Sequence, residues 1–136
     1  MRRNLAASIA LAGSLGLSLA GCSPQEPLIV DSSGLPDTTD TQGPYLVTAR
    51  VEGRLGVDGV VLVWQNLTES TVTAQRVTMT QDSAGAWSGG IPGQGIGALI
   101  AFHVEATNQS GDVSSDPLAG STSECGDQYC FHVVAY

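Results

Sequence analysis

The stretch ALIAFHVEATNQSG, residues 98–111, decides the fold class of this chain. One set of side chains is apolar and recurs at every second position: Ile100, Phe102, Val104 and Ala106. The positions between them hold a second, more polar set: Ala101, His103 and Glu105. Because successive side chains of a strand point to opposite faces, this alternation predicts a β-strand over residues 98–107. The first set is expected in the core and the second set in water.

Runs with a similar residue pattern precede and follow this segment in the sequence. Five further strands are predicted from alternating or β-branched runs, at residues 45–52, 59–65, 71–81, 86–92 and 129–136. Between them lie short stretches of glycine, asparagine, aspartate, serine and proline, which favour turns. No window beyond the first 22 residues has a helical period. The pattern predicts an all-β domain, an antiparallel β-sandwich over residues 44–136.

The spacing aromatic-x-Val-x-Ala-x-Asn-x-x-Gly, from Phe102 to Gly111, resembles the penultimate strand of fibronectin type III and related immunoglobulin-like domains. The preceding segment VTMTQDSAGAWSGGIP, residues 77–92, resembles a hairpin of the same repeat in bacterial extracellular proteins. The resemblance implies an immunoglobulin-like sandwich with a last strand after Pro117, and it says almost nothing about function. Phe102 stands where the family usually has tyrosine. The hydroxyl of a tyrosine corner is therefore missing, and one backbone group needs another partner.

The first 22 residues have the features of an export signal. Two arginines precede an uncharged run, which ends in LAGC at residues 19–22. This arrangement resembles the signal peptide and lipobox of bacterial lipoproteins. It implies removal of residues 1–21, lipidation of Cys22 and a place in the bacterial cell envelope. Ser23 after the cysteine favours the outer membrane by the same resemblance. The alternative is an ordinary secretory signal with a chance cysteine.

Residues 22–43 are predicted to form an acidic, flexible tether that begins at the acylated cysteine. They hold three prolines, four acidic residues and no basic residue, and too few apolar side chains to order themselves. Such a tether would span roughly 25 Å as a coil and about 65 Å when fully extended. The alternative is that the isolated apolar trio Leu28–Val30 adds an edge strand to the domain.

The charge of the chain limits its partners. Without residues 1–21 there are 13 acidic residues and three arginines, so the formal charge is 3 − 13 = −10, and no lysine is present. Such a surface repels phosphate backbones, which argues against nucleic acid as a partner. It also gains little from an anionic membrane surface, so membrane attachment depends on the lipid at Cys22. The expected partner is a protein.

Two pairs of residues are candidates for special chemistry. Cys125 and Cys130 remain after lipidation, and an even pair in an exported chain predicts a disulfide, with a zinc site that includes His132 as the alternative. His103 and His132 are expected on the outer faces of the last two strands, with Glu105 close by. If the register brings them together, they form a divalent-metal or proton-sensitive patch. The sequence favours two solvated surface histidines over this patch, and no cofactor is expected.

Two further groups have both a structural and a ligand-binding interpretation. Asn108, Asp112 and Asp116 lie in a polar segment and offer oxygens to calcium, but they lack the spacing of an EF-hand loop, which favours a solvated turn. Trp64 and Trp87 are expected in or near the core, with a sugar-binding platform as the alternative.

The sequence contains no recognisable catalytic set, so we expect no enzyme. It predicts an envelope lipoprotein that presents a structural or recognition β-sandwich near the membrane. One alternative is an accessory subunit or inhibitor of an envelope hydrolase, because similar domains accompany secreted peptidases. The other is a metal-binding domain that uses His103 and His132.

Overall fold

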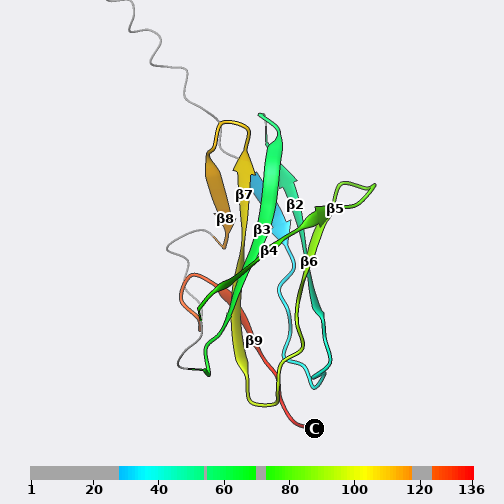
Figure 1. Cartoon of the computed structure of the whole chain (residues 1–136), viewed down its shortest axis with the longest axis vertical. Helices are drawn as coiled ribbons and strands as arrows, with labels where there is room; N and C mark the ends of the chain where they lie inside the picture. The colour runs from blue at the N-terminus through cyan, green and yellow to red at the C-terminus, as the bar shows by residue number, and fades with distance from the viewer. Residues whose placement is uncertain (1–27, 54, 70–72, 118–123) are drawn as a thin grey trace, which may run out of the picture.

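A computed structural model describes residues 28–53, 55–69, 73–117 and 124–136, and in these ranges the chain is all-β, without a helix. Figure 1 shows the strands in chain order: β1 (Leu28–Ser32), β2 (Tyr45–Glu52), β3 (Val57–Asn66), β4 (Gln75–Thr78), β5 (Thr80–Gln81), β6 (Trp87–Ile91), β7 (Leu99–Asn108), β8 (Val113–Asp116) and β9 (Tyr129–His132). The prediction of an all-β domain is confirmed for the described residues.

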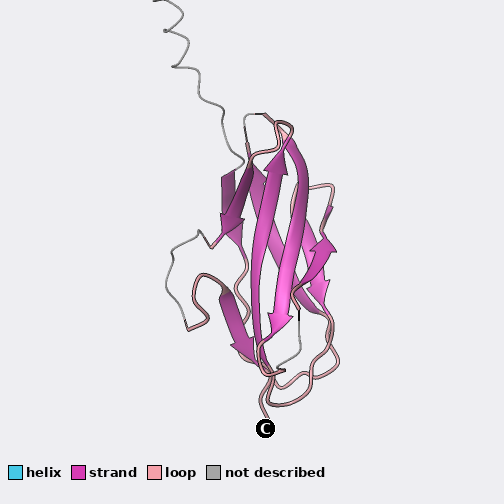
Figure 2. Cartoon of the chain, turned by 60° about the vertical axis from the view of Figure 1, so that its left-hand side comes forward, coloured by secondary structure: helices cyan, strands magenta, loops and turns pink. Residues whose placement is uncertain are grey.

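Two antiparallel sheets pack face to face as a β-sandwich (Figure 2). One sheet has the order β1-β2-β6-β5, and the other has the order β4-β3-β7-β8 with β9 also paired to β7. β8 and β9 share one edge of β7. β8 pairs with residues 104–107 of that strand, and β9 pairs with residues 99–102.

The core lies between the sheets and contains the inner face of β7. Its largest fully buried side chains are Phe102, Phe131, Leu62, Met79, Ile91 and Ile100. The ring of Phe102 lies 5.6 Å from that of Tyr129 and 6.2 Å from that of Phe131, between ring centroids. Large aromatic rings contribute heavily to the free energy of folding because each removes a large apolar area from water. The inner face of β7 therefore holds the side chains of β9 in the core.

The predicted division of β7 into two faces is confirmed with one correction. All four residues expected in the core are fully buried: Ile100, Phe102, Val104 and Ala106. On the other face His103 and Glu105 are half-buried, but Ala101 is fully buried as well. Ala101 lies opposite Gln65 of β3 and Cys130 of β9, and these neighbours cover its small side chain.

The run at residues 71–81, predicted as one strand, is divided between the two sheets. β4 pairs with β3 in one sheet, and β5 pairs with β6 in the other. Met79 lies between them with its side chain in the core, and its amide donates to the carbonyl of Val60 at 2.9 Å. Among the described residues 73–81, Met79 is the one that is fully buried, and the change of sheet occurs there.

β8 lies where the sequence favoured a turn. Val113–Asp116 has the sequence VSSD, which has one apolar residue and no alternation that marks a strand. β8 forms because its backbone pairs with residues 104–107 at the edge of β7. A short edge strand of this kind is specified by its neighbour and not by its own composition.

The prediction of a flexible tether is wrong for residues 28–43. β1 pairs antiparallel with β2, so the alternative of an added edge strand at Leu28–Val30 is confirmed. After β1 the chain crosses to the other sheet, where Thr38 forms a parallel bridge with Val133. The amide of Thr38 donates to the carbonyl of His132 at 3.0 Å, and the amide of Val134 donates to the carbonyl of Thr38 at 2.8 Å. Backbone hydrogen bonds order this segment, and the composition of its side chains does not reveal them. The signal peptide at 1–21, Cys22 and the rest of the tether lie outside the described residues.

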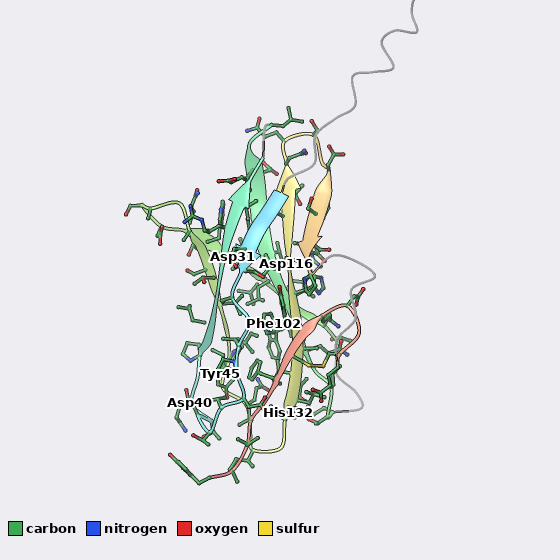
Figure 3. The ribbon with its side chains drawn as sticks, turned by 180° about the vertical axis from the view of Figure 1, so that it is seen from behind. Asp31, Asp40, Tyr45, Phe102, Asp116 and His132 are labelled. Carbon is green, nitrogen blue, oxygen red and sulfur yellow. A yellow bond between two sulfur atoms is a disulfide. The ribbon has the colours of Figure 1, made fainter. Side chains whose placement is uncertain are left out.

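The end of the sandwich near Tyr45 is fastened by a tyrosine, although β7 has none. The Tyr45 hydroxyl donates to the carbonyl of Asp40 at 2.6 Å and accepts from the amide of Gln94 at 3.1 Å (Figure 3 shows Tyr45 beside Asp40). The two chain segments pack so closely here that a Cβ on Gly93 would meet the carbonyl oxygen of Gln42 at 2.5 Å. Only glycine fits at that position.

Candidate functional site

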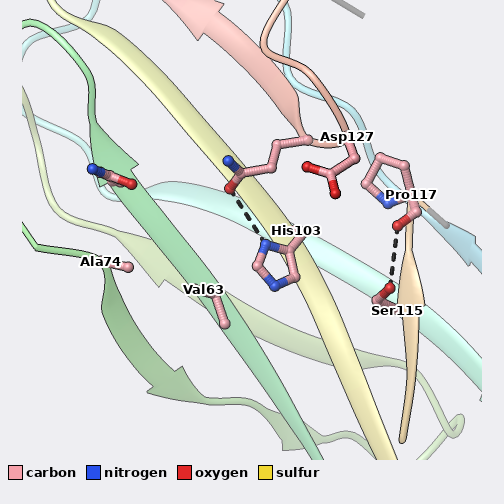
Figure 4. A pocket seen from close by; sticks show the side chains of 8 residues that line it. Val63, Ala74, His103, Ser115, Pro117 and Asp127 are labelled. Atoms are coloured by element: carbon pink, nitrogen blue, oxygen red, sulfur yellow. Dashed lines mark hydrogen bonds between the residues drawn. The ribbon is translucent and has the colours of Figure 1, made fainter. Parts of the chain in front are cut away.

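The outer face of the five-stranded sheet carries a hollow of about 250 Å³ above His103 (Figure 4). Its walls come from β3, β7, β8 and the segments that flank the sheet: Val63, Gln65, Ala74, His103, Ser115, Pro117, Asp127 and Gln128. Residues far apart in the sequence therefore meet over the middle of β7.

The hollow exists because β8 ends and β9 begins on either side of His103. Val104 pairs with Asp116, and Phe102 pairs with Tyr129, but His103 has no partner between them on that edge. On its other side His103 lies opposite Val63 of β3. Pro117 and Gln128 flank the gap between the two edge strands, and their side chains form its rim.

The imidazole of His103 has a polar partner next to each of its nitrogens. Its Nε2 lies 2.8 Å from Oε2 of Glu105, and its Nδ1 lies 3.3 Å from Oε1 of Gln128. The other oxygen of Glu105 accepts from Nη2 of Arg76 on β4 at 2.7 Å. These contacts form one polar network that runs across β4, β7 and the segment before β9.

The network keeps Glu105 ionised. Burial acts to raise the pKa of this carboxyl group, but the hydrogen bonds and charges of His103 and Arg76 outweigh it, so the net pKa is lowered. The carboxylate therefore fixes the imidazole at neutral pH and compensates the charge of the arginine.

The hydroxyl of Ser115 and the imidazole of His103 contact different partners in the hollow. The hydroxyl of Ser115 donates to the carbonyl of Pro117 at 3.3 Å, while the Nε2 of His103 faces Glu105. A nucleophile requires a base within hydrogen-bond distance, and these contacts do not pair Ser115 with the imidazole.

The patch of two histidines, which was the alternative to two solvated side chains, is not formed. His132 lies opposite Leu99, four residues from His103 along β7, which is about 13 Å at the rise of a strand. Its Nδ1 lies 3.3 Å from Asp37 and its Nε2 lies 3.5 Å from Glu124. Only His103 and Glu105 are neighbours as expected. Within the described ranges no cluster of three or more His, Cys, Asp or Glu side chains could hold a metal ion.

Cys125 and Cys130 are joined in a disulfide, with their Cα atoms 6.1 Å apart. The ring that they close contains Asp127 and Gln128, so the bond ties one rim of the hollow to β9. The alternative zinc site with His132 is not formed, because that imidazole contacts Asp37 and Glu124.

Two further polar groups, Asp37 and Asn108, form hydrogen bonds within the fold. The amide of His132 donates to Asp37 at 2.8 Å, and this backbone hydrogen bond is the main cause of the lowered pKa of Asp37. Burial opposes the shift, and the contacts with the His132 side chain lower the pKa further. Asn108 is buried, and its Oδ1 accepts from the amides of Ser110 and Asp112 at 2.9 and 3.0 Å. Its oxygen therefore closes a turn and is not directed at a calcium ion.

Asp116 fastens the edge between the two sheets. Its Oδ2 accepts hydrogen bonds from the hydroxyl of Tyr129 at 3.0 Å and from the hydroxyl of Ser32 on β1. Figure 3 shows Asp116 next to Asp31 at this edge. Burial raises the pKa of Tyr129, and the hydrogen bond to Asp116 raises it further. Nothing in the sequence signalled this cluster, because its three members come from segments that meet only in the folded chain.

The two tryptophans do not form a platform for sugars. Trp64 and Trp87 are partly buried and pack against the core. The Nε1 of Trp87 is buried and has no hydrogen-bond partner among the described residues. Both side chains stabilise the sandwich.

No protein-family model matches the chain, and no curated protein matches it. In the described part of the chain, no helix has the length and apolar character that crossing a membrane would require.

Proposed function

We propose that the chain is a cell-envelope lipoprotein whose β-sandwich recognises a partner protein through the outer face of its five-stranded sheet. The observation that carries the proposal is the hollow above His103 with its fixed network of Arg76, Glu105 and Gln128. A concave site with a few oriented polar groups favours specific binding. The domain has no catalytic activity of its own in this proposal.

The sandwich is, in this proposal, of the fibronectin type III and immunoglobulin-like kind. β3 and β7 pair at the centre of one sheet, as strands C and F do in immunoglobulin-like domains. β2 pairs with β6 in the other sheet, as strands B and E do. The spacing from Phe102 to Gly111 supports the same assignment of β7.

The lipid at Cys22 anchors the domain, and the anchor holds it close to the membrane. Cys22 precedes the start of β1 by six residues, which span at most about 20 Å. This reach is much shorter than the tether expected from sequence. The end of the sandwich that holds Leu28 and Glu52 therefore faces the bilayer, which by the resemblance of Ser23 is the outer membrane.

Metabolic labelling tests the anchor. Cells that express the wild-type chain should incorporate a palmitate analogue into it, and cells that express Cys22→Ala should release an unlabelled protein. Equal labelling of both proteins would contradict the proposed lipidation.

Photo-crosslinking tests the recognition face. A photo-reactive phenylalanine analogue replaces Thr78, which is exposed on β4 at the face of the hollow, or Thr48, which is exposed on β2 at the opposite face. Irradiation of intact cells should give a discrete adduct from position 78 and none from position 48. Adducts from neither position, or equal adducts from both, would contradict the proposal. A hydrolase in the adduct would favour the accessory or inhibitory role.

A further inference from the structure

We infer that the hollow above His103 receives a basic side chain, an arginine or a lysine, that projects from the partner protein. This inference rests on the proposed recognition function and names the chemistry of its ligand. Size, lining and charge each lead to it.

The size and walls of the hollow suit one long side chain. Its volume of about 250 Å³ is below the roughly 300–1,000 Å³ of pockets that enclose small molecules. Val63, Ala74 and Pro117 give it apolar walls. The methylene stem of an arginine or lysine packs against apolar surface while its charged end stays near water.

Acceptors for the charged end lie at the rim. The carboxylate of Asp127 is exposed, and no ion pair to it occurs among the described residues. The carbonyl of Pro117 already accepts from Ser115 and has a second lone pair. A guanidinium or ammonium group bound here would form charge-assisted hydrogen bonds, which are stronger than neutral ones.

No cation of the described chain competes for Asp127. Arg76 is paired with Glu105 at 2.7 Å, and Arg50 lies on β2 in the other sheet. The remaining charge at the rim is negative. At longer range the formal charge of −10 after removal of residues 1–21 attracts a basic partner and repels an acidic one.

Nuclear magnetic resonance with defined peptides tests the inference. The ¹⁵N-labelled chain from residue 22, with Cys22→Ser, is titrated with capped tripeptides Gly-Arg-Gly, Gly-Lys-Gly and the neutral Gly-citrulline-Gly. The two basic peptides should shift the amide signals of His103, Ser115, Asp127 and Gln128, and the neutral peptide should not. Asp127→Asn should weaken binding about two- to fivefold, the range of an exposed ion pair.

Asp58→Asn is the matched control, because Asp58 is exposed on β3 and does not line the hollow. It should leave the affinity and the pattern of shifts unchanged. Shifts spread over all acidic residues, an equal loss in both variants, or no shift at all would overturn the inference. If position 78 still crosslinks to a partner in cells, the recognition function stands and only the basic ligand is wrong. If that crosslink is also absent, the proposed function itself has failed.

Discussion

The two faces of β7 differ in what they contribute to the molecule. The inner face, from Ile100 to Ala106, is fully buried, and each of its side chains contacts the core. The outer face is formed by the residues at the alternate positions, and there His103 and Glu105 lie in a polar network beneath a hollow. The inner face contributes to the core of the fold, and the outer face carries the proposed recognition site. β7 therefore contributes both to the core and to the hollow, because successive side chains of a strand point to opposite faces.

The largest effect is expected on the inner face. Val104→Asp would bury a carboxylate without a partner, at a cost of several kcal/mol. A domain of this size has only about 5–15 kcal/mol in total, so this variant should be unfolded or nearly so. His103→Gln, one residue away, should change the free energy of unfolding by about 1 kcal/mol or less. Denaturant titrations of both variants measure the difference. An equal loss in the two variants would mean that the faces are not independent.

A smaller loss of stability is expected from a change at Asp116, at the edge that joins the two sheets. Asp116→Ala removes the acceptor of two hydroxyl groups, on Ser32 and Tyr129, and should cost about 1–3 kcal/mol. Asp58→Ala, an exposed change on β3, should cost about 0.5 kcal/mol or less. Thermal melts compare the two variants. A cost at Asp116 no larger than that at Asp58 would show that the hydroxyl groups need no acceptor there.

The same edge should make the domain sensitive to alkali. The pKa of Tyr129 is raised in the folded chain by burial and by Asp116, so the neutral phenol is favoured. Its contribution is complete below the unfolded pKa of about 10 and is lost as the pH rises through the higher folded value. Denaturant midpoints between pH 8 and 11 should fall less steeply for Tyr129→Phe than for the wild type. Parallel curves would contradict this assignment.

The smallest effect is expected from the network on the outer face. The pKa of Glu105 is lowered, so its contribution is complete above the ordinary value of about 4.3 and is lost as the pH falls through the folded value. Glu105→Gln should reduce the loss of stability between pH 5 and about 3. It should cost no more than about 1 kcal/mol at pH 7, because Arg76 is largely exposed. A larger cost would assign this network to the fold and not to recognition.

The inner face of β7 and the strand at Tyr45–Glu52 could be predicted from the sequence, because the alternation of side chains is a local signal. β8 and the crossing segment at Thr38 could not, because backbone bonds to distant strands hold them. The site was predictable only in part. The outward direction of His103 follows from its position on the strand, but its separation from His132 depends on a register that no local pattern encodes.

The hollow could not be predicted from the sequence. Its position is set by where the pairing of β8 with β7 ends, at Asp116, and where the pairing of β9 with β7 begins, at Tyr129. A polar edge strand and a loop of unpatterned composition carry no signal of where each will pair. The disulfide was predictable as a pair of cysteines, but its position at the rim, beside Asp127, was not.

Filling the hollow tests most directly whether it is the recognition site. Ala74→Trp places a large ring at the rim from an exposed position, and Thr48→Trp places the same ring on the opposite sheet. If the hollow is the recognition site, Ala74→Trp should abolish the crosslink from position 78 and Thr48→Trp should preserve it, while both variants melt at the temperature of the wild type. A full crosslink in folded Ala74→Trp would contradict the account.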